Sequence, residues 1–196
     1  MHRWPMWLGL LLGLAAVATG FEMGADRVEQ WGMAARFTAR VGFPLLILAY
    51  VARPLTQLVK AKWAKSLLAK RQWIGLGFAM SHTVHLVALF IALEVANDTR
   101  PWFVYLIGGG AYAMLYVMAF TSNQYAMRSL GKWWKRLHRF GIHYLWLIFA
   151  QSYVGRIFQD GKMEEGAIGA GIAFAAAAIR FAAWRRSRAR KAASAT

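Results

Sequence analysis

The chain contains no cysteine and few acidic residues. Without cysteine, disulfide bonds, thiolate metal ligands, iron–sulfur clusters and covalent attachment of a c-type haem are all excluded. No G-x-G-x-x-G or P-loop pattern occurs, and the apolar stretches leave no room for a soluble nucleotide-binding domain.

Apolar residues make up 59% of the 196 residues, and the mean hydropathy is +0.35. They fall in blocks rather than in the narrow stripes of a soluble helical protein. Each block approaches the roughly 20 residues that a helix needs to cross the hydrocarbon of a bilayer. We predict an all-α integral membrane protein, a bundle of six transmembrane helices in one domain over residues 1–196. The predicted spans are about 4–21, 41–59, 73–93, 102–120, 138–158 and 167–184.

Charge separates the loops into two sets. All eight acidic residues lie in three alternate loops: Glu22, Asp26, Glu29, Glu94, Asp98, Asp160, Glu164 and Glu165. The opposite ends of the spans are basic and free of acids, from Arg3 through Lys60–Arg71 and Arg128–Arg139 to Arg185–Lys191. The positive-inside rule then places both termini in the cytoplasm of a multi-pass protein of the bacterial inner membrane. We interpret the net charge of +16 as a topology signal and an attraction to anionic lipid headgroups, with no nucleic-acid partner.

Three local features refine the spans. The first span lacks a convincing cleavage site, so we expect a retained helix rather than a signal peptide. Pro44 and the pair Arg53-Pro54 predict a kink or an early helix end near Arg53. The run Gly108–Gly110 opens the fourth span and predicts a close approach between helices.

Four of the five histidines lie inside apolar stretches. His82 and His85 fall in WIGLGFAMSHTVHLVALFIAL, and His138 and His143 fall in LHRFGIHYLWLIFAQSYV. A histidine within the membrane usually marks a functional site, and neutral imidazole is a good axial ligand for haem iron. Two histidine-bearing helices therefore predict a haem b, with a zinc site and a proton-conducting histidine relay as the alternatives.

The spacing of the histidines limits the number of haems. Two haems stacked across a bilayer need ligands about 20 Å apart on each helix, whereas His82 and His85 are one turn apart. One haem is the economical prediction, and a second at the cytoplasmic edge would use His138 with another ligand. The expected depth of His143 in the membrane is closer to that of His82 than to that of His85. His138 is too shallow to bind an iron at mid-membrane. Cationic partners for the haem propionates are expected from the arginines near the cytoplasmic side, which are Arg53, Arg71 and Arg139.

Three segments resemble the ferric-reductase-like transmembrane family, and most of all the haem-binding membrane subunits of bacterial periplasmic methionine sulfoxide reductase systems. They are GADRVEQWGMAARFTARVGFPLLILAYVARPL, RQWIGLGFAMSHTVHL and MAFTSNQYAMRSLGKWWKRLHR, within about residues 24–158. The resemblance implies a six-helix, haem b-binding protein that passes electrons across the membrane, with His85 at a ligand position and His138 at the start of the fifth span. The family's second histidine of that span corresponds to Gln151, and the next histidine here is His143.

We therefore predict a b-type cytochrome subunit of an oxidoreductase system. Quinol or a cytoplasmic flavin reductase would donate electrons, and a periplasmic or membrane protein would accept them. The alternatives are a stand-alone quinone or ferric reductase, which would also bind quinone, and a transporter or channel with a histidine relay. We favour His143 as the ligand of the fifth span. On the third span His82 and His85 rank nearly equal, with a lean to His85 from the resemblance.

Overall fold

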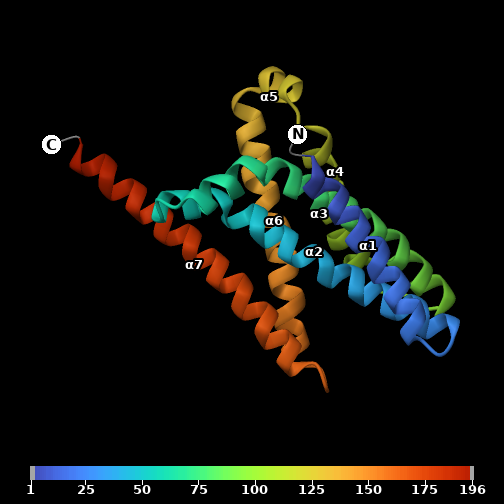
Figure 1. Cartoon of the computed structure of the whole chain (residues 1–196). Coiled ribbons are helices and arrows are strands. Elements are labelled where there is room, and N and C mark those ends of the chain that lie inside the picture. Colours follow the sequence, from blue (N-terminus) through green and yellow to red (C-terminus); the bar gives the residue numbers. More distant parts are fainter. Residues whose placement is uncertain (1–2, 195–196) are drawn as a thin grey trace. The chain divides into compact units, whose positions relative to one another are not determined.

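The computed structural model describes residues 3–194, and no β-strand occurs over that range (Figure 1). Seven helices follow one another through these residues: α1 (Trp4–Met23), α2 (Arg27–Leu58), α3 (Lys62–Val95), α4 (Trp102–Phe120), α5 (Gln124–Leu130), α6 (Lys132–Ile157) and α7 (Met163–Ala193). The all-α class predicted from the apolar blocks is confirmed. His2, the histidine outside the apolar stretches, lies outside the described residues.

The helices form two compact units. The first unit consists of Met1–Leu46 and Gln72–Gly141, and the second of Ile47–Arg71 and Ile142–Thr196. Helices α2, α3 and α6 each contribute one part to each unit, whereas α1, α4 and α5 belong to the first and α7 to the second. The candidate histidines are divided between them, with His82, His85 and His138 in the first unit and His143 in the second.

Glycines bring α1 close to its neighbours in the first unit. A Cβ added to Gly9 would collide with the backbone of Gly77 on α3, and one added to Gly20 would collide with the backbone of Ala34 on α2. A Cβ added to Gly13 would lie 3.3 Å from Cβ of Val84, a tight contact that falls short of a collision. Small residues let helices pack closely in a membrane, where no hydrophobic effect drives them together. The first span is therefore integrated into the first unit as a packed helix.

Small residues also carry the contact between α6 and α7 in the second unit. A Cβ on Gly166 would lie 2.6 Å from the backbone nitrogen of Ile157, and one on Gly169 would collide with the ring of Tyr153. The indole Nε1 of Trp146 donates a hydrogen bond to the carbonyl of Ala173, 3.0 Å away. The buried face of α7 consists of glycine and alanine at Gly166, Gly169, Ala170, Ala173, Ala176 and Ala183.

Five helices of the described chain are long and apolar enough to cross a membrane, namely α1, α2, α3, α4 and α7. Helix α6, which was expected to form the fifth of six spans, is 26 residues long but falls short in hydropathy. Its first turns are basic and aromatic (KWWKRLHRF), and His143, Gln151 and Arg156 follow. The six-span count and the cytoplasmic position of both termini stay predictions.

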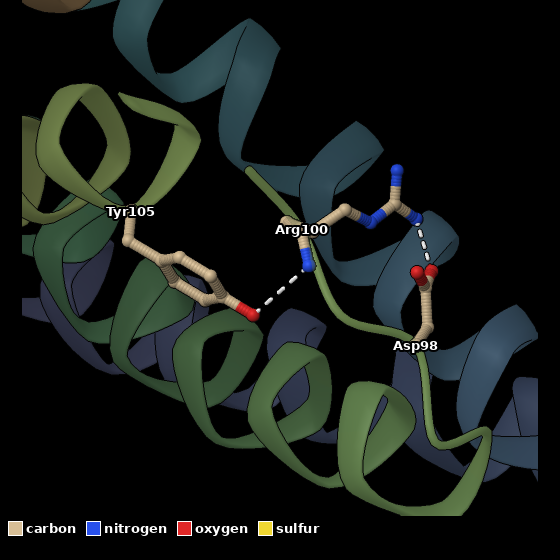
Figure 2. Close-up of polar contacts among 3 residues, drawn as sticks. All are labelled: Asp98, Arg100 and Tyr105. Carbon is tan, nitrogen blue, oxygen red and sulfur yellow. Dashed lines mark hydrogen bonds and ion pairs between the residues drawn. The ribbon is translucent and has the colours of Figure 1, made fainter. Parts of the chain in front are cut away.

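The connection between α3 and α4 lies in the first unit and contains Asp98, whereas Glu94, the other acidic residue expected in this loop, lies in the last turn of α3. Asn97 adopts a positive φ of 48° just after α3, a conformation that asparagine tolerates better than most residues. The guanidinium of Arg100 pairs with the carboxylate of Asp98, and the Arg100 backbone N–H donates to the hydroxyl of Tyr105 at 3.2 Å (Figure 2). These contacts join the turn to the first turns of α4.

Of the two alternatives expected near Arg53, the early helix end is wrong, because α2 continues to Leu58, and the kink stays a prediction. Proline lacks a backbone N–H, so Pro54 leaves the carbonyl of Tyr50 without its usual helical donor. Arg180 of α7 supplies the missing bond, because its Nη1 donates to the Tyr50 carbonyl at 2.8 Å. The helix therefore passes the proline with its freed carbonyl satisfied by a side chain.

The close helix approach expected at Gly108–Gly110 is wrong for Gly108 and Gly109. A Cβ added at either position would meet no atom within 4 Å. Adjacent glycines point to different faces of a helix, so a run of three does not make the continuous groove that spaced small residues make.

Two glycines of α3 provide a test of the α1 contact. We expect Gly77→Ala to lower the thermal unfolding midpoint, because the new Cβ would collide with the carbonyl of Pro5, and overpacking costs about 1–3 kcal/mol. Gly75→Ala is the matched control, since its Cβ meets nothing within 4 Å and alanine favours a helix by roughly 1 kcal/mol. Thermal unfolding curves of the two purified variants in detergent measure this difference in midpoint. Equal midpoints for the two variants would contradict the contact.

Candidate functional site

Two histidines of α3 lie together in an aromatic cluster of the first unit. The ring centroids of His82 and His85 are 5.1 Å apart. Phe78 lies 4.5 Å from His82 on one side, and Tyr112 of α4 lies 6.1 Å from it on another. The predicted pair of adjacent histidines is therefore brought into one environment, which combines these aromatic rings with a few buried hydroxyl groups.

Thr38 of α2 determines which nitrogen of His85 carries the proton. Its Oγ1 lies 2.7 Å from the carbonyl of Ala34, one helical turn back, and 3.0 Å from Nδ1 of His85. A hydroxyl has one hydrogen, and the short contact to the carbonyl uses it. The Thr38 oxygen must then accept from Nδ1–H of His85, so the lone pair of that imidazole lies on Nε2. A metal-binding histidine is commonly held in this way, with one ring nitrogen donating and the other ligating.

His82 is packed differently. Only 8% of this residue is exposed, and a Cβ added to Gly42 on α2 would collide with Nδ1 and Cε1 of its ring. A glycine is therefore required at position 42 for the imidazole to lie against the backbone of α2. This packing orients the edge that contains Nδ1 and Cε1 toward α2.

His138 lies in the first unit on α6, where it stacks on Trp134 with ring centroids 4.2 Å apart. Its Nε2 lies 3.0 Å from Oγ1 of Thr121, whose hydroxyl donates to the carbonyl of Val117 at 2.6 Å. By the argument applied to Thr38, Nε2 of His138 is the donor and its lone pair lies on Nδ1. Trp134 also donates from its indole Nε1 to the Thr121 carbonyl at 2.8 Å.

His143 lies in the second unit and has close polar neighbours on both ring nitrogens. Its Nε2 is 3.3 Å from Nη2 of Arg180, and its Nδ1 is 3.1 Å from the hydroxyl of Tyr50. A guanidinium can only donate, so Nε2 accepts and Nδ1–H donates to Tyr50. The Arg180 guanidinium also lies over the Tyr50 ring at 4.3 Å, and Trp146 stacks on that ring at 5.9 Å.

The predicted arginines lie in different settings. Arg71 donates from Nε to the carbonyl of Ala49 at 2.9 Å and experiences the positive charge of both Arg53 and Arg180. Three cations thus gather in the second unit, and Arg53 is exposed there. Arg139 is exposed on the part of α6 that belongs to the first unit.

The structure brings His82 and His85 together and gives His138 and His143 separate polar partners. The pairing of a histidine of α3 with His143 stays a prediction. Thr38, Tyr50 and Arg180 are site residues that the sequence reasoning missed. A signal for Arg180 was present, because it is the one charged residue in the stretch 166–184, and an ionisable residue inside an apolar span is a candidate functional residue.

Comparison with known proteins identifies a haem-binding relative of this chain. No family model matches the chain, and no solved structure matches it. The chain is 30% identical over 165 residues to the protein-methionine-sulfoxide reductase haem-binding subunit MsrQ of Cronobacter sakazakii (strain ATCC BAA-894). The match covers 72% of this chain and 80% of that protein. The chain therefore belongs to the MsrQ family of membrane proteins, the haem-binding subunits of protein-methionine-sulfoxide reductase.

Proposed function

We propose that this chain is a haem b-binding subunit that carries electrons through the bacterial inner membrane to a partner that reduces methionine sulfoxide. The MsrQ relative is named as the haem-binding subunit of such a reductase. The apolar helices supply a membrane scaffold for such a haem. The electron donor in this proposal is quinol or a cytoplasmic flavin reductase, and the acceptor is the catalytic subunit.

The observation that carries the proposal is the hydrogen bond between Thr38 and His85. It places the lone pair of a membrane-embedded imidazole on Nε2 and fixes the orientation of the ring. The surroundings fit a haem, because Phe78 and Tyr112 offer aromatic faces beside the histidine pair. A haem iron held by two histidines supplies reversible one-electron transfer and keeps no coordination site open for oxygen.

His85 is our proposed ligand from α3, and His82 is the residue that packs beside it. From α6 we propose His143, whose Nε2 would exchange its hydrogen bond with Arg180 for the iron. His138 is the other candidate from α6, and it offers Nδ1 rather than Nε2. We propose one haem per chain, with a second only if His138 also ligates.

Anionic propionates need cationic partners when they leave water. Arg71 lies close enough to Arg53 and to Arg180 to be repelled by their positive charges, and an anion beside Arg71 would offset that repulsion. We propose Arg53, together with Arg71 or Arg139, as a partner of a propionate.

The Thr38 contact yields the sharpest prediction. We expect Thr38→Val to weaken haem retention by roughly 10- to 100-fold, the usual effect of removing a residue that orients a metal ligand. His85→Ala should remove the low-spin haem signal altogether. Pyridine haemochrome analysis per mole of protein and the reduced-minus-oxidised spectrum measure both effects.

Thr19→Val is the matched control for that experiment. Thr19 lies on α1 and donates to the carbonyl one turn back at 3.0 Å, as Thr38 does, but it is exposed. The control should keep the wild-type haem content, which we expect to be about one per chain. Full haem retention in both Thr38→Val and His85→Ala would show that His85 is not a ligand.

Arg53 provides a second prediction. We expect Arg53→Leu to lower the haem content or the reduction midpoint potential, because a propionate would lose part of its positive surroundings. Arg185→Leu is the control, since it removes one of the exposed cations at the basic end of α7. Spectroelectrochemical titration compares the variants. An Arg53→Leu variant with wild-type haem content and potential would restrict Arg53 to contact with lipid headgroups.

The membrane topology provides a third prediction. Reporter fusions at Gly24, Asn97 and Lys162 should report the periplasm, and a fusion at Lys60 the cytoplasm, because the acidic residues are confined to alternate loops. The fusion at Lys162 tests α6 directly. If α6 did not cross the membrane, Lys162 would lie on the same side as Arg128, and the six-span proposal would fail.

A further inference from the structure

The side chain of Tyr112 on α4 carries a buried hydroxyl. Its oxygen is shielded from solvent and has no hydrogen-bond partner among residues 3–194. A buried donor left unsatisfied costs about 1–3 kcal/mol, and in a membrane no surrounding solvent can supply the bond. A hydroxyl kept at such a position therefore points to a partner that is not part of the protein chain.

The position of Tyr112 shows where that partner would bind. The Tyr112 ring lies 6.1 Å from the ring of His82, which in turn lies 5.1 Å from His85. All three residues belong to the first unit. The phenol thus borders the cluster that contains the proposed iron ligand.

A neighbouring tyrosine shows that α4 can satisfy a phenol within the protein. Tyr116 lies one turn further along α4, and its ring centroid is 6.4 Å from that of Tyr112. Its hydroxyl donates to Oγ1 of Thr83 at 3.2 Å. Both tyrosines lie on α4, but only the hydroxyl of Tyr116 has an acceptor among the described residues. Tyr116 is therefore the matched control for Tyr112.

We propose that the Tyr112 hydroxyl donates a hydrogen bond to a propionate carboxylate of the haem that His85 binds, an inference that rests on the proposed function. The periphery of haem b carries methyl, vinyl and propionate groups, and only the carboxylates are strong acceptors. A bond from a neutral donor to a carboxylate is charge-assisted and stronger than one between neutral groups. Tyr112 is then a positioning residue that holds one edge of the haem and offsets part of its negative charge.

The test compares Tyr112→Phe with Tyr116→Phe in the full-length chain purified with haem. Tyr112→Phe should release haem to apomyoglobin roughly ten-fold faster or more, as expected for losing one hydrogen bond to a charged group. It should also lower the reduction midpoint, because the less compensated carboxylate favours ferric iron. Tyr116→Phe should match the wild type in both measurements.

Haem dimethyl ester, in which both carboxylates are esterified, provides a test that needs no variant. The wild-type chain should lose the ester faster than haem b, and Tyr112→Phe should add little to the loss rate of the ester. Equal loss of the two haems from the wild type would overturn the proposal, even if Tyr112→Phe failed to accumulate.

The remaining outcomes separate this proposal from the proposed function. A wild-type chain that binds no haem would overturn both. A haem-loaded wild type with an unaltered Tyr112→Phe variant would overturn only the role of Tyr112. Equal changes in both phenylalanine variants would indicate general repacking of α4, and would also overturn it.

Discussion

A donor or acceptor inside a membrane finds no partner in the lipid, so the protein or a bound group must supply one, and this constraint determines the chemistry of the histidines in this chain. In the first unit, the hydroxyl hydrogen of Thr38 is committed to a backbone carbonyl, so the oxygen can only accept from His85. In the second unit, Pro54 withholds a backbone N–H from the Tyr50 carbonyl, and Arg180 supplies it. The committed hydroxyl hydrogen of Thr38 thus sets the proton position on His85. The N–H that Pro54 lacks positions Arg180, which sets the proton position on His143.

The two imidazoles carry their proton on the same atom but meet different groups at the other nitrogen. His85 and His143 both donate from Nδ1, to a threonine hydroxyl and a tyrosine hydroxyl respectively. The Nε2 atom of His143 accepts from a guanidinium that is itself held by the Tyr50 carbonyl and lies on the Tyr50 ring. Iron binding at His143 therefore competes with an arrangement that Pro54 helps to build, whereas iron binding at His85 is supported by the Thr38 bond.

The apolar blocks predicted the helical class and the positions of most helices, and for residues 102–120 the predicted span coincides with α4. Hydropathy marks the segment that suits the membrane rather than the ends of the helix. For that reason α2 begins at Arg27 and α3 at Lys62, well before the predicted spans. The short helix α5 was missed because it has no apolar block, and only the residues at its two ends indicate it. The side chain of Asn123 caps its N-terminus by accepting from the Ala126 N–H, and Gly131 follows its last residue.

The candidate site was only partly predictable, for a related reason. The histidines are visible in the sequence because they interrupt apolar runs. Their partners are ordinary residues whose roles arise from contacts between distant segments. Thr38 and His85 are 47 residues apart, and Tyr50 and His143 are 93 residues apart. Periodicity and composition describe one segment at a time, so they cannot show which hydroxyl faces which ring.

The position of His143 follows the same logic. The histidine expected from the family pattern corresponds to Gln151, which is exposed on α6. Eight residues of helix separate the two positions, which is about 12 Å along the axis and about 80° around it. A histidine at position 151 would therefore lie out of reach of Tyr50 and Arg180, the groups that hold the ring of His143. Arg180 is in turn held by a carbonyl that Pro54 leaves without a helical donor. Tyr50 and Arg180 thus hold the ring of His143, and the carbonyl freed by Pro54 holds Arg180. None of these three residues would hold a histidine at position 151.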